Sequence, residues 1–135
     1  MKAQDLMAKA EQAAVSAKVL LDTGDGDGAS NRAYYAMFDA ARAVLLASGF
    51  DVGKTHRGVL NAFSERLVKN GSVPQEMGRL LKRAETFRYV ADYEGDPVEL
   101  SDAREMVGQA EIFVAAMRVK FMPEESSSDG YGTEP

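Results

Sequence analysis

The chain has 135 residues, of which 45% are hydrophobic and 27% charged, a composition that suits one globular domain with a single core. It contains no cysteine, which excludes disulfides and thiolate metal sites, and one histidine, which excludes a histidine-rich metal cluster within one chain. No stretch approaches the roughly 20 apolar residues that span a bilayer, and the first residues lack the apolar segment of a signal peptide, so we expect a cytoplasmic protein without membrane contact.

The net charge of −5 is unevenly distributed along the chain. Residues 123–135 hold four carboxylates and no basic residue, so −1 remains for residues 1–122. A segment rich in Ser, Gly and Glu is typical of disorder. We therefore predict a helical domain over residues 1–122 and a disordered acidic tail over residues 123–135.

Five segments have apolar residues at helical spacing, and none alternates like a strand. They cover residues from about 3 to 21, 30 to 48, 55 to 69, 74 to 91 and 101 to 121. Ser30 or Asn31 suits the N-cap of the second segment, after the glycine-rich sequence DTGDGDG. Pro74 opens the fourth, where proline is tolerated. Short connections between amphipathic helices predict an all-α, up-and-down bundle of four to five helices.

Two short sequences imitate ligand-binding motifs but have the wrong spacing. DTGDGDG lacks the glutamate that an EF-hand loop needs at its twelfth position. In GFDVGKT, three residues separate the two glycines, whereas a phosphate-binding P-loop needs four. We therefore expect no metal and no cofactor.

The predicted second helix carries a polar stripe. Arg32, Tyr35, Asp39 and Arg42 are spaced by three, four and three residues, which places them on one helical face. Asp39 can pair with either arginine. Taken alone, such a stripe is most simply a ladder of surface ion pairs that adds little stability.

The predicted fourth helix ends in a second polar cluster, ETFRYVADYE. Arg88 and Asp92 are four residues apart and should pair, and Tyr89 and Tyr93 should stack at the same spacing. Arg88 borders the apolar stripe, so its stem is partly buried or a carboxylate holds it. Two Arg/Tyr/Asp clusters in one small bundle favour a shared polar site.

The stretches SNRAYYAMFDAARAVL, KTHRGV, GRLLKRAETFRYVADYE and AREMVGQAEIFV resemble the HEPN family of small bacterial and archaeal helical proteins. The resemblance covers residues 3–120. It implies a bundle that dimerises and is often encoded beside a small nucleotidyltransferase of the MNT type. In such pairs the HEPN protein can be a toxin, a metal-independent ribonuclease that carries arginine and, after four to six residues, histidine at the dimer cleft.

The chain departs from that nuclease motif at the histidine. After Arg88, the histidine should be residue 93, 94 or 95, and these are Tyr93, Glu94 and Gly95. His56, the one histidine, has no arginine at the matching upstream positions. The arginine matches the motif and the histidine does not.

Our first interpretation is therefore an HEPN protein with a degenerate nuclease motif, the partner of an MNT-type nucleotidyltransferase in a toxin–antitoxin-like pair. We expect a homodimer whose polar centre binds phosphate or a partner and is built from Arg32, Tyr35, Asp39, Arg88, Asp92 and Tyr93. One alternative is an active ribonuclease, with Arg88 acting beside Asp92, Tyr93 or a symmetry-related His56. A module that binds RNA or a free nucleotide is the other.

Overall fold

The computed structural model describes residues 2–122, and in this part of the chain every regular element is helical and there is no strand. The predicted all-α bundle of four to five helices is confirmed. The predicted disordered tail lies outside the described residues. The elements are α1 (Ala3–Asp22), α2 (Gly26–Ala47), α3 (His56–Ala62), the π-helical segment η1 (Phe63–Val68), α4 (Gln75–Glu94) and α5 (Leu100–Phe121).

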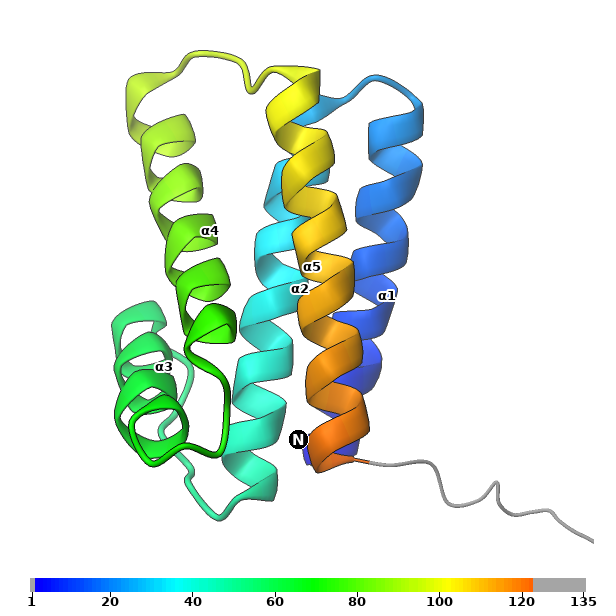
Figure 1. Cartoon of the computed structure of the whole chain (residues 1–135). Coiled ribbons are helices and arrows are strands. Elements are labelled where there is room, and N and C mark those ends of the chain that lie inside the picture. Colours follow the sequence, from blue (N-terminus) through cyan, green and yellow to red (C-terminus); the bar gives the residue numbers. More distant parts are fainter. Residues whose placement is uncertain (1, 123–135) are drawn as a thin grey trace, which may run out of the picture.

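The four long helices run up and down beside one another, and α3 with η1 forms a shorter unit beside the lower half of α4 (Figure 1). Helix α2 is central, because it packs against every other helical element. Side chains of α2 therefore meet side chains from distant parts of the sequence. None of the helices within residues 2–122 is both long and apolar enough to cross a membrane.

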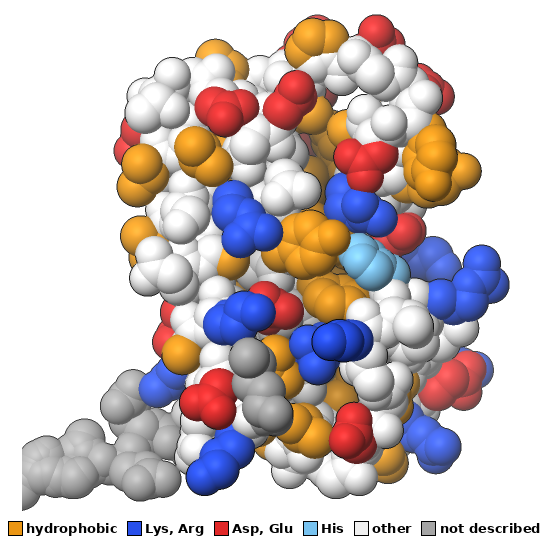
Figure 2. Space-filling view, turned by 180° about the vertical axis from the view of Figure 1, so that it is seen from behind, with side chains coloured by type: hydrophobic (Ala, Val, Ile, Leu, Met, Phe, Trp, Pro, Cys, Tyr) orange, Lys and Arg blue, Asp and Glu red, His pale blue; other side chains and the backbone are white. Residues whose placement is uncertain are grey.

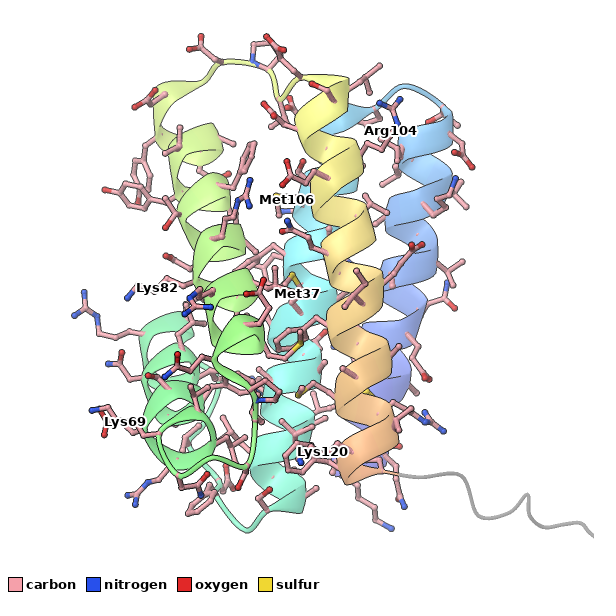
Figure 3. The ribbon with its side chains drawn as sticks, in the orientation of Figure 1. Met37, Lys69, Lys82, Arg104, Met106 and Lys120 are labelled. Atoms are coloured by element: carbon pink, nitrogen blue, oxygen red, sulfur yellow. The ribbon has the colours of Figure 1, made fainter. Side chains whose placement is uncertain are left out.

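Small side chains build the interface between α1 and α2. Both helices bury several alanines, and those of α1 are Ala10, Ala13, Ala14 and Ala17. Met37 and Met106 point into the bundle, whereas Lys69 and Lys120 point outward (Figure 3). The bundle therefore has one continuous core that reaches across α2.

Helix α2 begins earlier than the sequence predicts. The prediction of Ser30 or Asn31 as N-cap is wrong, because Asp25 caps the helix and its Oδ1 accepts the Gly28 N–H at 2.8 Å. Asp27 Oδ1 accepts the N–H of Val98, 71 residues away, at 2.8 Å. This cap and this long-range hydrogen bond offset the usual cost of glycine in a helix.

Candidate functional site

His56 is the first residue of α3, and its imidazole packs into an aromatic cluster on α2. Thr55 caps α3 by accepting a backbone hydrogen bond at 3.1 Å, which sets where the helix begins. The His56 ring stacks on Phe38 and Tyr34, with 4.8 Å and 5.5 Å between ring centroids. Tyr35 meets the same ring edge-on at 5.8 Å. Aromatic contacts therefore fix the plane of the imidazole.

Both ring nitrogens of His56 lie near tyrosine hydroxyls. The hydroxyl oxygen of Tyr34 is 2.7 Å from Nδ1, and that of Tyr35 is 3.5 Å from Nε2. Tyr34 is 0% exposed, so its hydroxyl bonds the imidazole in place of bulk water. The contact with Tyr35 is longer than an ordinary hydrogen bond and is therefore weak.

Arg88 of α4 contacts the same tyrosine. Its guanidinium carbon lies 5.1 Å from the centre of the Tyr34 ring, and its Nη1 donates to Asp92 Oδ2 at 2.6 Å. The Arg88 side chain is 22% exposed, so it lies at the edge of the core. Its Nε is buried and has no hydrogen-bond partner among the described residues. Arg88 and His56 therefore come together through Tyr34.

The environment of this cluster sets its charges. Burial raises the pKa of the Tyr34 phenol, and the nearby Arg88 charge offsets only part of that rise. Burial, followed by the Arg88 charge, lowers the pKa of the His56 imidazole from its ordinary 6.5, and the Glu85 carboxylate acts in the opposite direction. At neutral pH the cluster therefore contains a protonated phenol, a neutral imidazole and a permanent cation.

Further basic side chains lie around the cluster. The guanidinium carbon of Arg32 is 5.4 Å from the centre of the Tyr35 ring, and Arg57 directly follows His56. Within residues 2–122, Arg32, Arg42 and Arg57 take part in no ion pair. Figure 2 shows Lys and Arg side chains on several sides of the histidine. This face can therefore attract a polyanion.

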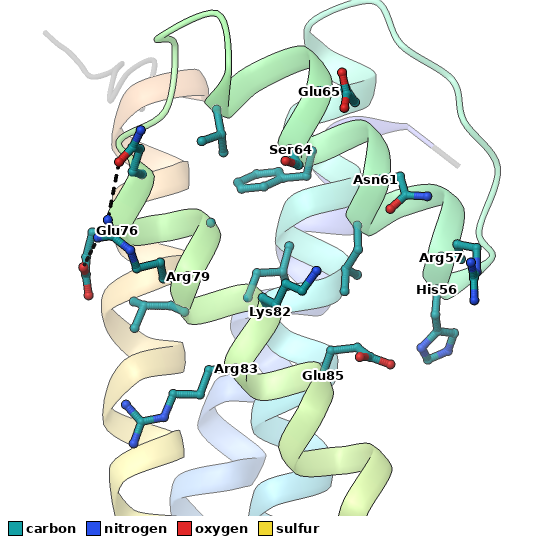
Figure 4. Close-up of a pocket in the computed structure, with 17 residues that line it drawn as sticks. His56, Arg57, Asn61, Ser64, Glu65, Glu76, Arg79, Lys82, Arg83 and Glu85 are labelled. Carbon is teal, nitrogen blue, oxygen red and sulfur yellow. Dashed lines mark hydrogen bonds and ion pairs between the residues drawn. The ribbon is translucent and has the colours of Figure 1, made fainter.

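A groove of about 1110 Å³ runs between α3–η1 and α4. His56 and Glu85 lie at one end of it and Arg79 at the other, with Lys82 between them (Figure 4). Leucine and phenylalanine side chains contribute to its lining. Lys82 and Arg57 take part in no ion pair among the described residues. The groove therefore offers an extended ligand both apolar and cationic contacts next to the imidazole.

On α4, the two predicted side-chain pairs are confirmed. Arg88 forms an ion pair with Asp92, and the ring centroids of Tyr89 and Tyr93 lie 4.5 Å apart. Tyr89 is 54% and Tyr93 75% exposed. Arg88 thus reaches the cluster around His56, while Tyr93 stays on the outer surface of the helix.

On α2, Arg32 and Tyr35 belong to the cluster around His56, and Asp39 lies further along the helix. Burial raises the pKa of the Asp39 carboxyl, and the charges of Lys9, Arg42 and Arg32 oppose that rise. No ion pair or hydrogen bond joins Asp39 to Arg88 within residues 2–122. In the same range, no three His, Asp or Glu side chains come together in a way that would hold a metal ion.

Two members of the cluster, Tyr34 and the His56 of the same chain, were not predicted as site residues. Tyr34 fits the apolar stripe of its helix, and only its hydroxyl, which needs a partner when buried, signals another role. His56 lies 22 residues further along, and helical spacing says nothing about contacts over that distance. Sequence reasoning therefore placed Tyr35, its neighbour, in the site in place of Tyr34.

Comparisons with known proteins agree over almost the whole described chain. The family model of the HEPN domain matches residues 3–120. "UPF0332 protein glr0978" of Gloeobacter violaceus is 39% identical over 113 residues, which cover 82% of this chain and 89% of that protein. "Putative toxin MJ0605" of Methanocaldococcus jannaschii is 33% identical over 111 residues, which cover 82% of each chain.

Proposed function

The chain belongs to the HEPN domain family, and from that premise we propose that it is a toxin-like ribonuclease that cleaves RNA with Arg88 and His56. The observation that carries this proposal is the meeting of Arg88 and His56 at one buried residue, Tyr34. The sequence lacks a histidine four to six residues after Arg88, but α3 brings an imidazole to Tyr34, the residue that Arg88 also contacts. The relative named "Putative toxin MJ0605" supports the toxin-like role.

The proposed reaction is transfer of the phosphoryl group within the RNA strand. The ribose 2′-oxygen gives its proton to water and attacks the adjacent phosphorus, the bond between phosphorus and the 5′-oxygen breaks, and that oxygen takes up a proton from water. The products are a 2′,3′-cyclic phosphate and a 5′-hydroxyl. Arg88 stabilises the charge on the non-bridging oxygens, with the guanidinium fork oriented by Asp92. His56 donates a hydrogen bond to a phosphate or ribose oxygen and so stabilises the charge that develops there.

The surroundings of the site suit a single RNA strand. Arg32 and Arg57 flank the cluster without ion-pair partners in the described chain, and Lys82 lies in the adjoining groove. Such cations bind phosphates without reading the bases, so we expect affinity to fall steeply with salt. An RNA substrate is consistent with a cytoplasmic protein.

We also propose that the chain forms a homodimer and pairs with an MNT-type nucleotidyltransferase, as the family resemblance implies. The C-terminal half of α4 supports a protein contact, because Tyr89, Val90 and Tyr93 expose apolar surface directly beside Arg88. A second copy bound there would bring two Arg88 side chains near one another. Light scattering of the purified protein measures this, and a monomer at all concentrations would contradict the dimer.

The test of the proposed function is cleavage of total RNA and of tRNA in the presence of EDTA. The wild type should cleave, and both Arg88→Ala and His56→Asn should not. In the second variant the amide oxygen of the introduced side chain can still accept a hydrogen bond from Tyr34, but the shorter side chain has no donor at the position of the His56 Nε2. Arg104→Ala is the matched control, because Arg104 is an exposed arginine on α5, away from the cluster (Figure 3).

Other outcomes of this experiment lead back to the earlier interpretations. RNA binding without cleavage, with the nucleotidyltransferase still bound, would make the chain the degenerate partner of a two-component pair. Binding of free nucleotides without either activity would favour a nucleotide-binding module. Cleavage that survives both substitutions would place the active site elsewhere.

A further inference from the structure

We propose that Tyr34 is a positioning residue that fixes His56 in one tautomer, with the proton on Nε2 and the Nδ1 lone pair bound to the tyrosine hydroxyl. The imidazole then meets RNA as a hydrogen-bond donor and not as a base. The tautomer follows from the geometry alone, whereas its use on RNA rests on the proposed function.

The first step is to count donors and acceptors around the buried hydroxyl. Tyr34 has one proton to donate, and His56 Nδ1, at 2.7 Å, is its hydrogen-bond partner. The nearby guanidinium of Arg88 offers only donors, so it cannot take that proton. The Tyr34 hydroxyl must therefore donate to Nδ1, which leaves the ring proton on Nε2.

The opposite arrangement is disfavoured. If Nδ1 carried the proton and donated to Tyr34, the hydroxyl proton would be buried without an acceptor, because Tyr34 is 0% exposed. Leaving a buried donor unsatisfied shifts an equilibrium by roughly 5- to 150-fold. The positive charge of Arg88 also disfavours this opposite tautomer, because it repels an Nδ1–H group that points toward the same hydroxyl oxygen.

The second ring nitrogen remains available. Nε2 lies 3.5 Å from the Tyr35 hydroxyl, too far for a strong hydrogen bond, so a phosphate or ribose oxygen can take over the Nε2 proton. His56 keeps this proton both when it is neutral and when it is protonated. Nε2 can therefore donate a hydrogen bond both above and below the pKa of the His56 imidazole.

Titration of His56 also depends on every polar group that faces it. These groups are Tyr34 and Tyr35 on α2, Arg88 and Glu85 on α4, and Arg57 beside it on α3. A hydroxyl that donates to Nδ1 stabilises the neutral imidazole and so lowers its pKa. Removing that hydroxyl should raise the pKa and release both tautomers.

The experiment is nitrogen-detected NMR of the ¹⁵N-labelled full chain without RNA. His56 is the one histidine, so its signals need no assignment by mutagenesis. Above the pKa of His56, the wild type should show an unprotonated Nδ1 and a protonated Nε2. Tyr34→Phe should lower the ratio of the two tautomers at least roughly five-fold and raise the pKa. Tyr93→Phe, the same change at an exposed site, should alter neither.

A proton on Nδ1 in the wild type overturns the proposal, and this measurement stands even if Tyr34→Phe fails to fold. An unchanged tautomer ratio in a folded Tyr34→Phe protein overturns it as well. The NMR result does not depend on RNA cleavage. A protein with the expected tautomer but no ribonuclease activity would contradict the proposed function and leave the tautomer assignment intact.

Discussion

Replacing Arg88 by alanine separates a functional arginine from a structural one. The side chain makes three kinds of contact: an ion pair with Asp92, a cation–π contact with Tyr34, and packing of its stem at the edge of the core. It also buries an Nε with no hydrogen-bond partner in the described chain. The three contacts stabilise the fold, whereas burial of the unsatisfied Nε destabilises it.

These contributions nearly balance. The ion pair is partly exposed, with Asp92 50% accessible, so it contributes about 0.2–1 kcal/mol. The contact over the ring contributes about 0.5–2 kcal/mol, and partial burial of three methylenes about 1–2 kcal/mol. Removing the unsatisfied Nε returns about 1–3 kcal/mol. We therefore expect Arg88→Ala to lower the free energy of unfolding by about 1–2 kcal/mol, against a usual total of about 5–15 kcal/mol.

Urea unfolding of the wild type, Arg88→Ala and the control Arg104→Ala measures this difference, and RNA cleavage is assayed on the same samples. A folded Arg88→Ala protein without cleavage would support a role for Arg88 in the reaction. A loss of more than about 4 kcal/mol would refute the reasoning, because it would show that the arginine holds the bundle together.

Four further predictions concern stability. Phe113→Ala should cost about 3–5 kcal/mol in urea unfolding, since Phe113 is 0% exposed, and a loss below about 1 kcal/mol would contradict its place in the core. Gly26→Ala should destabilise the protein, because the new Cβ would lie 2.5 Å from the backbone oxygen of Val98. Gly108→Ala, which has open space around the new Cβ, should stabilise the protein by about 0.5–1 kcal/mol. A Gly26→Ala protein more stable than Gly108→Ala would be inconsistent with the start of α2. Asp39→Asn should stabilise the protein at pH 7, with the gain fading as acid neutralises the wild-type carboxyl, because burial raises the pKa of Asp39; equal midpoints at pH 7 would argue against this. Below pH 6.5 the wild type should lose stability until the pH passes the lowered pKa of His56, and His56→Asn should lack that part of the slope; identical pH profiles would exclude it.

The negative charge of Asp39 is better explained by function than by stability. A carboxylate whose burial raises its pKa costs stability at neutral pH, yet Asp39 lies on the same helix face as Arg32 and Arg42. If Asp39→Asn is more stable, the charge is kept for a reason other than folding. Under the proposed function, that reason is to orient Arg32 and Arg42, which would contact RNA.

The sequence by itself determined the helices and their order. Apolar spacing, glycine, proline and capping residues act within a few positions, so their effect is visible without a structure. The Arg88–Asp92 and Tyr89–Tyr93 pairs were predictable for the same reason, since both are one helical turn apart. The start of α2 was not predicted, because the glycine-rich first turn is stabilised in part by a hydrogen bond from the Val98 N–H to Asp27, 71 residues away.

Only the tertiary structure decided which polar residues lie in one cluster. Tyr34, His56 and Arg88 lie on three different elements, and their contact depends on how α3 and α4 pack against α2. Packing is set by the shapes and volumes of many core side chains at once, which no local pattern encodes. For that reason the sequence identified Arg88 as a candidate site residue, whereas only the fold brought the imidazole of His56 to Tyr34, which Arg88 also contacts.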